Sequence, residues 1–284
     1  MSFSHTTHTK FSDPKSFEPI VGGWSLEPHP MSEAISGFVF HLGSEECQNE
    51  FDPGIHLVDL RARGVCDILS RVCTGDDGLP ERKLAGVCRD FALLAVSSFR
   101  CRGIPARLRV GFADYFKDGF WEDHWLCEYY MNGRWRLLDV EVAADTSISS
   151  IRFDPADVPL NRFLFASDAW LQIEAGKVSS GIFGVSRLNL CGEWFVAASV
   201  FRDAAALCGI ELKPWDYWGS NAHFEIGSRE ASAECRKAAG QLARKITESA
   251  RLETDQSLVN FAEWLPQDFV TSFPEGDPER VMLI

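Results

Sequence analysis

The chain has 284 residues, 45% of them hydrophobic and 12% aromatic, with a formal net charge of −13 at pH 7. An apolar fraction of this size is ordinary for a globular protein with a sizeable core. The acidic charge argues against nucleic acids and anionic membranes as partners, because both are bound by clustered Lys and Arg side chains.

Neither export, a membrane anchor nor a structural metal is expected. The first ten residues lack the basic and then apolar pattern of a signal peptide, and no uncharged apolar stretch is long enough to span a bilayer. An odd number of cysteines at scattered spacings, without a Cys-x-x-Cys pair, predicts reduced thiols in the cytoplasm and no metal or other cofactor. The nine cysteines are Cys47, Cys66, Cys73, Cys88, Cys101, Cys127, Cys191, Cys208 and Cys235.

The first half of the chain is predicted to hold a lead-in, two helices and a strand. Residues 1–30, rich in His, Thr, Ser and Pro, show no clear period and are expected to be irregular. Apolar residues spaced for one helical face predict helices over residues 53–72 and 88–99. Gly103 ends the second helix, and alternating apolar and charged residues predict a strand over 106–112.

The second half opens on a hairpin, since Asn132-Gly133 between two alternating runs is a strong turn signal. The predicted segments are strands over 123–130 and 134–142, a partly helical stretch over 160–210, an amphipathic helix over 229–252 and an irregular end from residue 266. No repeat or linker divides the chain, so residues 31–284 are predicted to form a single domain with a C-terminal helical extension.

Cys88 stands at the start of the second predicted helix, directly after Gly86-Val87. A nucleophilic cysteine works as a thiolate, and the unpaired N–H groups and positive dipole end of a helix N-terminus favour that form. Gly86 allows a sharp turn before the helix and keeps bulk away from the sulfur. Cys88 is therefore a candidate nucleophile.

His124 is the histidine best placed to pair with that thiol, because it lies on a hairpin whose register can be counted. With a two-residue turn at Asn132-Gly133, Leu126 opposes Asp139 and His124 opposes Glu141. Asp139 would then lie diagonally from His124 and could fix its tautomer through Nδ1, with Glu141 as the rival for that role. A three-residue loop would put Asp139 on the other face.

Each residue also has an ordinary structural interpretation. A free cysteine in an apolar helix is usually an inert core residue, a lone histidine near a strand start is usually structural, and an acid at a strand end is usually solvated. A cysteine, a histidine and an acid in this order, on a helix and then a hairpin, make catalysis and packing about equally probable.

Four segments carry a family pattern: Gly86-Val-Cys88 with Phe91-Ala-Leu-Leu94, Gly103-Ile-Pro-Ala-Arg107, Asp123-His-Trp125, and Trp135-Arg-Leu-Leu-Asp139. Together they resemble the transglutaminase-like superfamily of papain-type cysteine enzymes, in its order and close to its spacing, over a motif core of residues 80–142. The wider chain resembles bacterial transglutaminase-domain proteins. The family often has His-Ala-Trp and Asp-Pro, where this chain has His124-Trp125-Leu126 and Asp139-Val140.

The resemblance implies an α+β transglutaminase-like or papain-like core, in which the nucleophile helix packs on an antiparallel sheet and extra helices lie at both ends. It implies that Cys88 is the nucleophile, His124 the general base and acid, and Asp139 the orienting acid. Candidates for substrate binding are Trp121, Trp125, Glu141 and Arg107, although packing is the favoured interpretation of the two tryptophans and a solvated or salt-bridged strand face that of the arginine.

The expected chemistry is acyl transfer through a thioester on Cys88, with a peptide, protein or small-molecule acyl donor. Water as the acceptor gives a protease or amidase, and an amine gives a transglutaminase or an amide-bond-forming acyltransferase. The alternative from another class is a binding module that keeps the fold without turnover. The sequence does not separate hydrolysis from transfer, because exclusion of water at the acceptor side decides between them.

Overall fold

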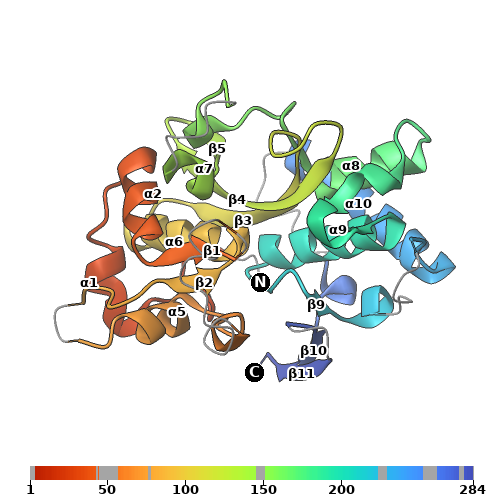
Figure 1. Cartoon of the computed structure of the whole chain (residues 1–284). Helices are drawn as coiled ribbons and strands as arrows, with labels where there is room; N and C mark the ends of the chain where they lie inside the picture. Colours follow the sequence, from red (N-terminus) through yellow and green to blue (C-terminus); the bar gives the residue numbers. More distant parts are fainter. Residues whose placement is uncertain are drawn as a thin grey trace. The chain divides into compact units, whose positions relative to one another are not determined.

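The computed structural model describes residues 4–42, 44, 57–75, 78–144, 151–222, 229–251, 261–274 and 278–283. Contacts divide the chain into two compact units. The first unit is Ser4–Leu108 with Leu126–Val158, and the second is Arg109–Trp125 with Pro159–Ile284 and Met1–Phe3. The chain passes between them within two strands, β3 (Ala106–Ala113) and β4 (Trp121–Met131). Figure 1 shows the mixture of helices and strands, which confirms the predicted α+β class.

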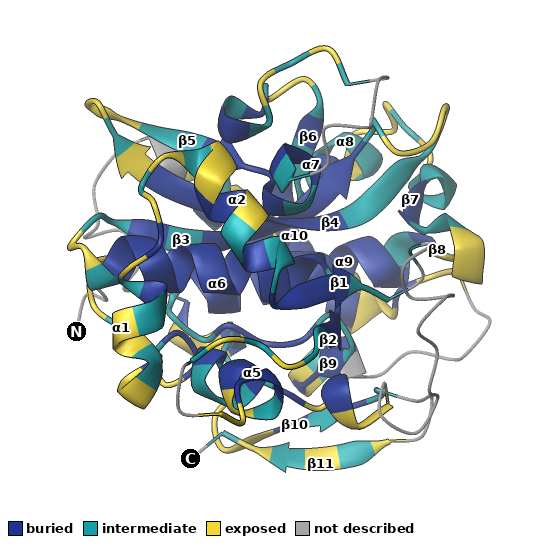
Figure 2. Ribbon diagram, turned by 60° about the vertical axis from the view of Figure 1, so that its left-hand side comes forward, coloured by how far each residue is buried: buried dark blue, intermediate teal, exposed yellow. Residues whose placement is uncertain are grey.

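The first unit is built around α6 (Cys88–Cys101), a helix buried from Cys88 through Arg100 (Figure 2). Helices α1, α2, α5 and α7 and strands β1 and β2 all pack against it. Its Phe99 also stacks on Tyr129 of β4, with ring centroids 4.6 Å apart, so the helix packs on the sheet as predicted. The other helical segments of this unit are η1 (Lys15–Phe17), α1 (Glu18–Val21), α2 (Pro28–Ser36), α5 (Val65–Val72), α7 (Val140–Ala144) and η2 (Pro155–Asp157).

Two strand pairs belong to the first unit. Strand β1 (Val39–His41) runs parallel to β2 (Leu84–Gly86), and β4 runs antiparallel to β5 (Arg134–Leu138). Asn132 and Gly133 have φ angles of 55° and 82°, which is the left-handed conformation that a two-residue type I′ turn requires. The predicted hairpin and its register, with Met131 opposite Arg134, are therefore confirmed.

In the second unit, three helices enclose a large apolar core. Helices α8 (Ala166–Glu174), α9 (Glu193–Leu207) and α10 (Ala233–Arg251) pack against one another, and every residue of α9 after Glu193 is buried. The remaining helical segments of this unit are η3 (Ser180–Ile182), η4 (Ser186–Leu188), η5 (Gly219–Ala222) and η7 (Ala262–Trp264). No helix in the described ranges is both long and apolar enough to cross a bilayer.

The strands of the second unit extend the central sheet and form a smaller one. The central sheet has the order β6-β3-β4-β7-β8, in which β4 and β7 are parallel, so the sheet is mixed and not wholly antiparallel as expected. The added strands are β6 (Phe163–Phe165), β7 (Phe183–Val185) and β8 (Leu190–Cys191), and those of the smaller antiparallel sheet are β9 (Asp216–Tyr217), β10 (Phe269–Ser272) and β11 (Glu279–Met282).

Several predicted boundaries are wrong. The lead-in contains α1 and the start of α2, each with a proline in its first turn, where the missing N–H costs nothing. The helix predicted over 53–72 is interrupted: residues 57–59 are helical, and α5 begins only at Val65, after Gly64 in an extended conformation. Residues 53–56 lie outside the described ranges. The end of the chain is not irregular, because β10 and β11 pair there.

Candidate active site

Cys88 is the first residue of α6, as predicted, and its residue surface is only 7% exposed. The preceding Val87 is extended, and its N–H donates to Oδ2 of Asp90 at 3.1 Å, while the N–H of Asp90 donates to the Val87 carbonyl at 2.7 Å. These two hydrogen bonds fix the start of the helix. The sulfur therefore belongs to the first turn, where the helix dipole favours a negative charge.

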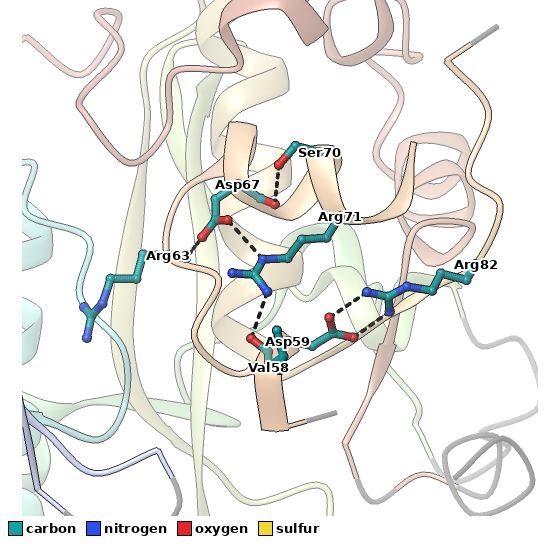
Figure 3. Close-up of polar contacts among 7 residues, drawn as sticks. All are labelled: Val58, Asp59, Arg63, Asp67, Ser70, Arg71 and Arg82. Atoms are coloured by element: carbon teal, nitrogen blue, oxygen red, sulfur yellow. Dashed lines mark hydrogen bonds and ion pairs between the residues drawn. The ribbon is translucent and has the colours of Figure 1, made fainter. Parts of the chain in front are cut away.

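A buried carboxylate, Asp59, pairs with Arg82, which lies shortly before the strand that leads to Cys88 (Figure 3). Its two oxygens accept hydrogen bonds from the guanidinium of Arg82 at 2.7 and 2.8 Å, and Oδ2 also accepts from the N–H of Ala85 in β2 at 3.1 Å. The hydrogen bond to Asp59 raises the pKa of Arg82 above its ordinary value. Two charge-assisted bonds and one backbone bond thus anchor β2 just before the cysteine.

A second carboxylate, Asp67, holds the start of α5 (Figure 3). It accepts hydrogen bonds from the N–H of Arg63 at 2.9 Å and from Nε of Arg71 at 3.0 Å. The Nη1 of Arg71 in turn donates to the carbonyl of Val58 at 3.0 Å, directly beside Asp59. Asp67 therefore fixes the start of α5, and Arg71 joins this helix to the residue that precedes Asp59.

Gly86 is required because Val39 and Asp90 pack closely against it. A Cβ at this position would lie 2.6 Å from Cγ1 of Val39 and 3.2 Å from Oδ2 of Asp90. The space beside this glycine is thus occupied by the core and by the capping carboxylate. This explains the glycine two residues before Cys88 without invoking room for a substrate.

Asp139 lies between β5 and α7 and is 1% exposed. Its Oδ1 accepts a hydrogen bond from the N–H of Val142 at 3.1 Å, and its carbonyl accepts from the N–H of Ala143 at 3.0 Å. Asp139 therefore caps α7, a role that the sequence analysis missed. Since α7 packs against α6, the structure places Asp139 and Cys88 on neighbouring elements of one unit.

The predicted strand over 134–142 is wrong after Leu138, because Val140–Ala144 is helical. The ladder between β4 and β5 ends with Cys127 opposite Leu138. Glu141 lies on α7, so its predicted position on a strand opposite His124 is incorrect. The strand β5 ends because Asp139 caps the helix α7, which follows it directly.

His124 is 4% exposed and lies on the part of β4 that belongs to the second unit. Two aromatic rings from the preceding loop stand against its imidazole, those of Tyr115 and Phe116. Cys88 and Asp139 are in the first unit, so the pairing of the thiol with the imidazole stays a prediction.

Asp123 precedes His124 and has a strongly perturbed carboxyl group. Its Oδ1 is buried without a hydrogen-bond partner in the described structure, and burial raises its pKa to about 6, although Arg202 and His124 lower it in part. Acids with raised pKa values next to a candidate catalytic residue are typical of active sites.

Replacing Asp123 with asparagine is expected to stabilise the protein at neutral pH. The raised pKa contributes stability that is complete below pH 3.8 and is lost as the pH rises through about 6. Asp123→Asn should therefore match the wild type near pH 4 and exceed its free energy of unfolding by up to about 3 kcal/mol at pH 7.5. Urea titrations across this range, with the exposed Asp118→Asn as control, measure the trend; a difference independent of pH would contradict it.

The other predicted binding residues have packing partners. Trp121 stacks on Phe183 with ring centroids 6.1 Å apart, and Trp125 is buried, its Nε1 without a hydrogen-bond partner among the described residues. Arg107 donates to Oε2 of Glu128 at 2.5 Å and lies over the Trp135 ring at 4.1 Å. These contacts are the structural roles considered above, and substrate binding by these residues stays a prediction.

Burial suppresses ionisation of several other thiols. It raises the pKa of Cys208 and Cys235 to about 11, raises that of Cys127 further, and raises that of Cys101 as well. Cys47 lies outside the described ranges. Within those ranges, no three His, Cys, Asp or Glu side chains are grouped as a metal site. The sequence analysis missed Tyr115 and Phe116, which lie against His124. Two adjacent aromatic residues shortly before the strand of His124 were the feature of the sequence that could have indicated them.

Part of the chain is similar to known proteins. No curated protein matches the chain. The crystal structure of a "Putative Cysteine Protease" from Cytophaga hutchinsonii is 19% identical, with a TM-score of 0.33; the match covers 58% of this chain and 47% of that one, about half its length. The model of the transglutaminase-like superfamily matches residues 70–140, which include Cys88, His124 and Asp139. The similarity of this chain to the transglutaminase-like superfamily thus covers residues 70–140.

Proposed function

We propose that the protein is a cysteine-dependent acyl-transfer enzyme that cleaves or exchanges an amide or ester bond through a thioester on Cys88. The observation that carries the proposal is the position of Cys88 at the N-terminus of a 14-residue helix whose start is fixed by buried carboxylates, inside the transglutaminase-like match. The match supports a cysteine-based enzyme in general. The triad with His124 and Asp139 is part of the proposal.

In the proposed reaction, the Cys88 thiolate attacks the carbonyl carbon of the acyl donor. The backbone N–H of Cys88, at the first position of α6, donates to the oxyanion that forms. His124 then gives its proton to the leaving amine or alcohol, and the carbon–nitrogen or carbon–oxygen bond breaks to leave the thioester. Water or an amine, deprotonated by His124, attacks the thioester and releases the thiolate. Asp139 orients the imidazole.

The raised pKa values of other thiols make the proposed reactivity of Cys88 testable by alkylation. With iodoacetamide at pH 6, Cys88 is expected to react at least about tenfold faster than Cys101 and Cys127, whose burial disfavours their thiolates. The His124→Ala variant should lose this preference, because the imidazolium that stabilises the thiolate is gone. Peptide mass spectrometry gives the rate at each cysteine, and equally slow labelling of all of them would contradict the proposal.

Product analysis separates the two acceptors. Model acyl donors, incubated with and without a primary amine, give only free acid for a hydrolase and an amide with the amine for a transferase. The Cys88→Ser variant is the control for reactions that do not pass through the thiol. The acyl donor itself is a peptide, a protein or a small molecule in this proposal.

A further inference from the structure

The loop between β3 and β4 places two adjacent aromatic rings against His124. The ring centroid of Phe116 lies 4.8 Å from that of the imidazole, with 67° between the planes, and that of Tyr115 lies at 6.2 Å and 86°. The two aromatic rings are themselves 4.7 Å apart. All three residues belong to the second unit, so this cluster is complete within one compact part of the chain.

Phe116 differs from its neighbours in exposure. Its side chain is among the exposed large hydrophobic groups, at 43%, whereas His124 is 4% exposed. One part of the phenyl ring therefore contacts the imidazole while the rest faces solvent. A single exposed phenylalanine is ordinary on a protein surface, but one that covers a buried histidine shields that histidine from water.

The loop that carries Phe116 is held at both ends. Nε of Arg162 donates to Oδ1 of Asp114 at 2.6 Å, and the N–H of Asp114 donates to the Arg162 carbonyl at 3.3 Å. At the other end, the N–H of Phe120 donates to the Lys117 carbonyl at 3.2 Å, around a glycine with positive φ. These contacts fix where the loop leaves β3 and where it enters β4.

We propose that Phe116 is a positioning residue for His124, which it shields from bulk water and holds in one ring orientation. The catalytic meaning of this role depends on the proposed function. A histidine that takes a proton from a thiol and returns it to a leaving group works best when its ring is fixed and few water molecules compete for its nitrogens. The Tyr115 ring packs against both the phenyl ring and the imidazole.

Carbethoxylation by diethyl pyrocarbonate tests the shielding directly. His124 should react about tenfold faster in Phe116→Ala than in the wild type, because the imidazole gains access to solvent. Phe116→Tyr, which keeps a ring of the same shape, should restore slow modification. Peptide mass spectrometry follows His124, and the half-exposed His29 of the first unit is the internal reference. Equal His124 rates in wild type and Phe116→Ala, or equal rates in the Ala and Tyr variants, would overturn the proposal.

Alkylation of Cys88 in the same variants tests positioning and separates this proposal from the proposed function. Phe116→Ala should slow Cys88 alkylation at pH 6 several-fold, and Phe116→Tyr should restore it, if His124 stabilises the thiolate. An unchanged rate of Cys88 alkylation in Phe116→Ala, together with faster carbethoxylation of His124, would overturn the positioning role. A wild type in which Cys88 is not preferred would contradict the proposed function, whereas carbethoxylation would still decide whether Phe116 shields His124.

Discussion

Replacing Asp203 with alanine is expected to lower the free energy of unfolding by about 3–5 kcal/mol, because it breaks a buried ion pair. Asp203 of α9 accepts hydrogen bonds from Nε and Nη2 of Arg109 in β3, both at 3.0 Å, and from the N–H of Val110 at 2.9 Å. Both charged side chains are almost fully buried. The variant leaves the guanidinium without this carboxylate and the Val110 N–H without its acceptor.

Urea denaturation at pH 7 measures this loss, and two variants serve as controls. Asp203→Asn keeps an acceptor for Val110 but not the charge, so it should lose less than the alanine variant. The double variant Arg109→Met with Asp203→Leu removes both charges and should recover part of the stability. If Asp203→Ala lowers the free energy of unfolding by less than about 1 kcal/mol, the ion pair is hydrated in solution, and the prediction from its burial is wrong.

Replacing Asp90 with alanine is expected to cost about 2–4 kcal/mol and also to slow Cys88 alkylation. Asp90 is fully buried, pairs with the equally buried Arg89 through Oδ1 at 2.9 Å, and caps the helix through Val87. The variant removes the cap and one partner of a buried pair. Because the first turn of α6 frays without the cap, the thiolate at Cys88 loses part of its stabilisation.

An exposed acid in a similar position is the matched control for Asp90. Asp67→Ala removes a carboxylate that accepts the Arg63 N–H before α5 and pairs with Arg71, but this pair is 41% and 25% exposed. It should cost only about 1 kcal/mol and leave Cys88 unaffected. If both variants lose the same stability and Cys88 reacts alike in each, burial of the Asp90 pair is not what holds the nucleophile.

The parts of the fold that were predictable from the sequence depend on local chemistry. The turn at Asn132-Gly133 fixes the register of the hairpin by its own backbone preference, and the start of α6 after Gly86 follows from helix periodicity. The end of β5 was missed because Val140 and Val142 alternate as in a strand. In the structure, the hydrogen bond from the Val142 N–H to the Asp139 side chain favours a helix over the strand that this alternation predicts. That hydrogen bond forms only when the segment is already helical, so the residue pattern alone does not reveal it.

The contacts that support the candidate site are mostly not local. Arg109 and Asp203 are 94 residues apart in the chain, and Asp59 meets Arg82 across 23 residues. The sequence spacing of these residues does not predict the pairs, because any of several arginines in a compact chain could be the partner of each carboxylate. The same holds for Phe116, whose contact with His124 requires the loop to fold back on the strand that follows it.

The strand pairings described above differ greatly in the length of chain that each must close. The hairpin of β4 and β5 is closed by two residues, at a small entropic cost. The parallel pair of β1 with β2 joins positions about 45 residues apart, and that of β4 with β7 joins positions about 60 apart, so both carry a larger loop-closure cost. The hairpin that leads from His124 to Asp139 is thus kinetically the most accessible piece of the sheet. We therefore expect it to form before the distant strands pair.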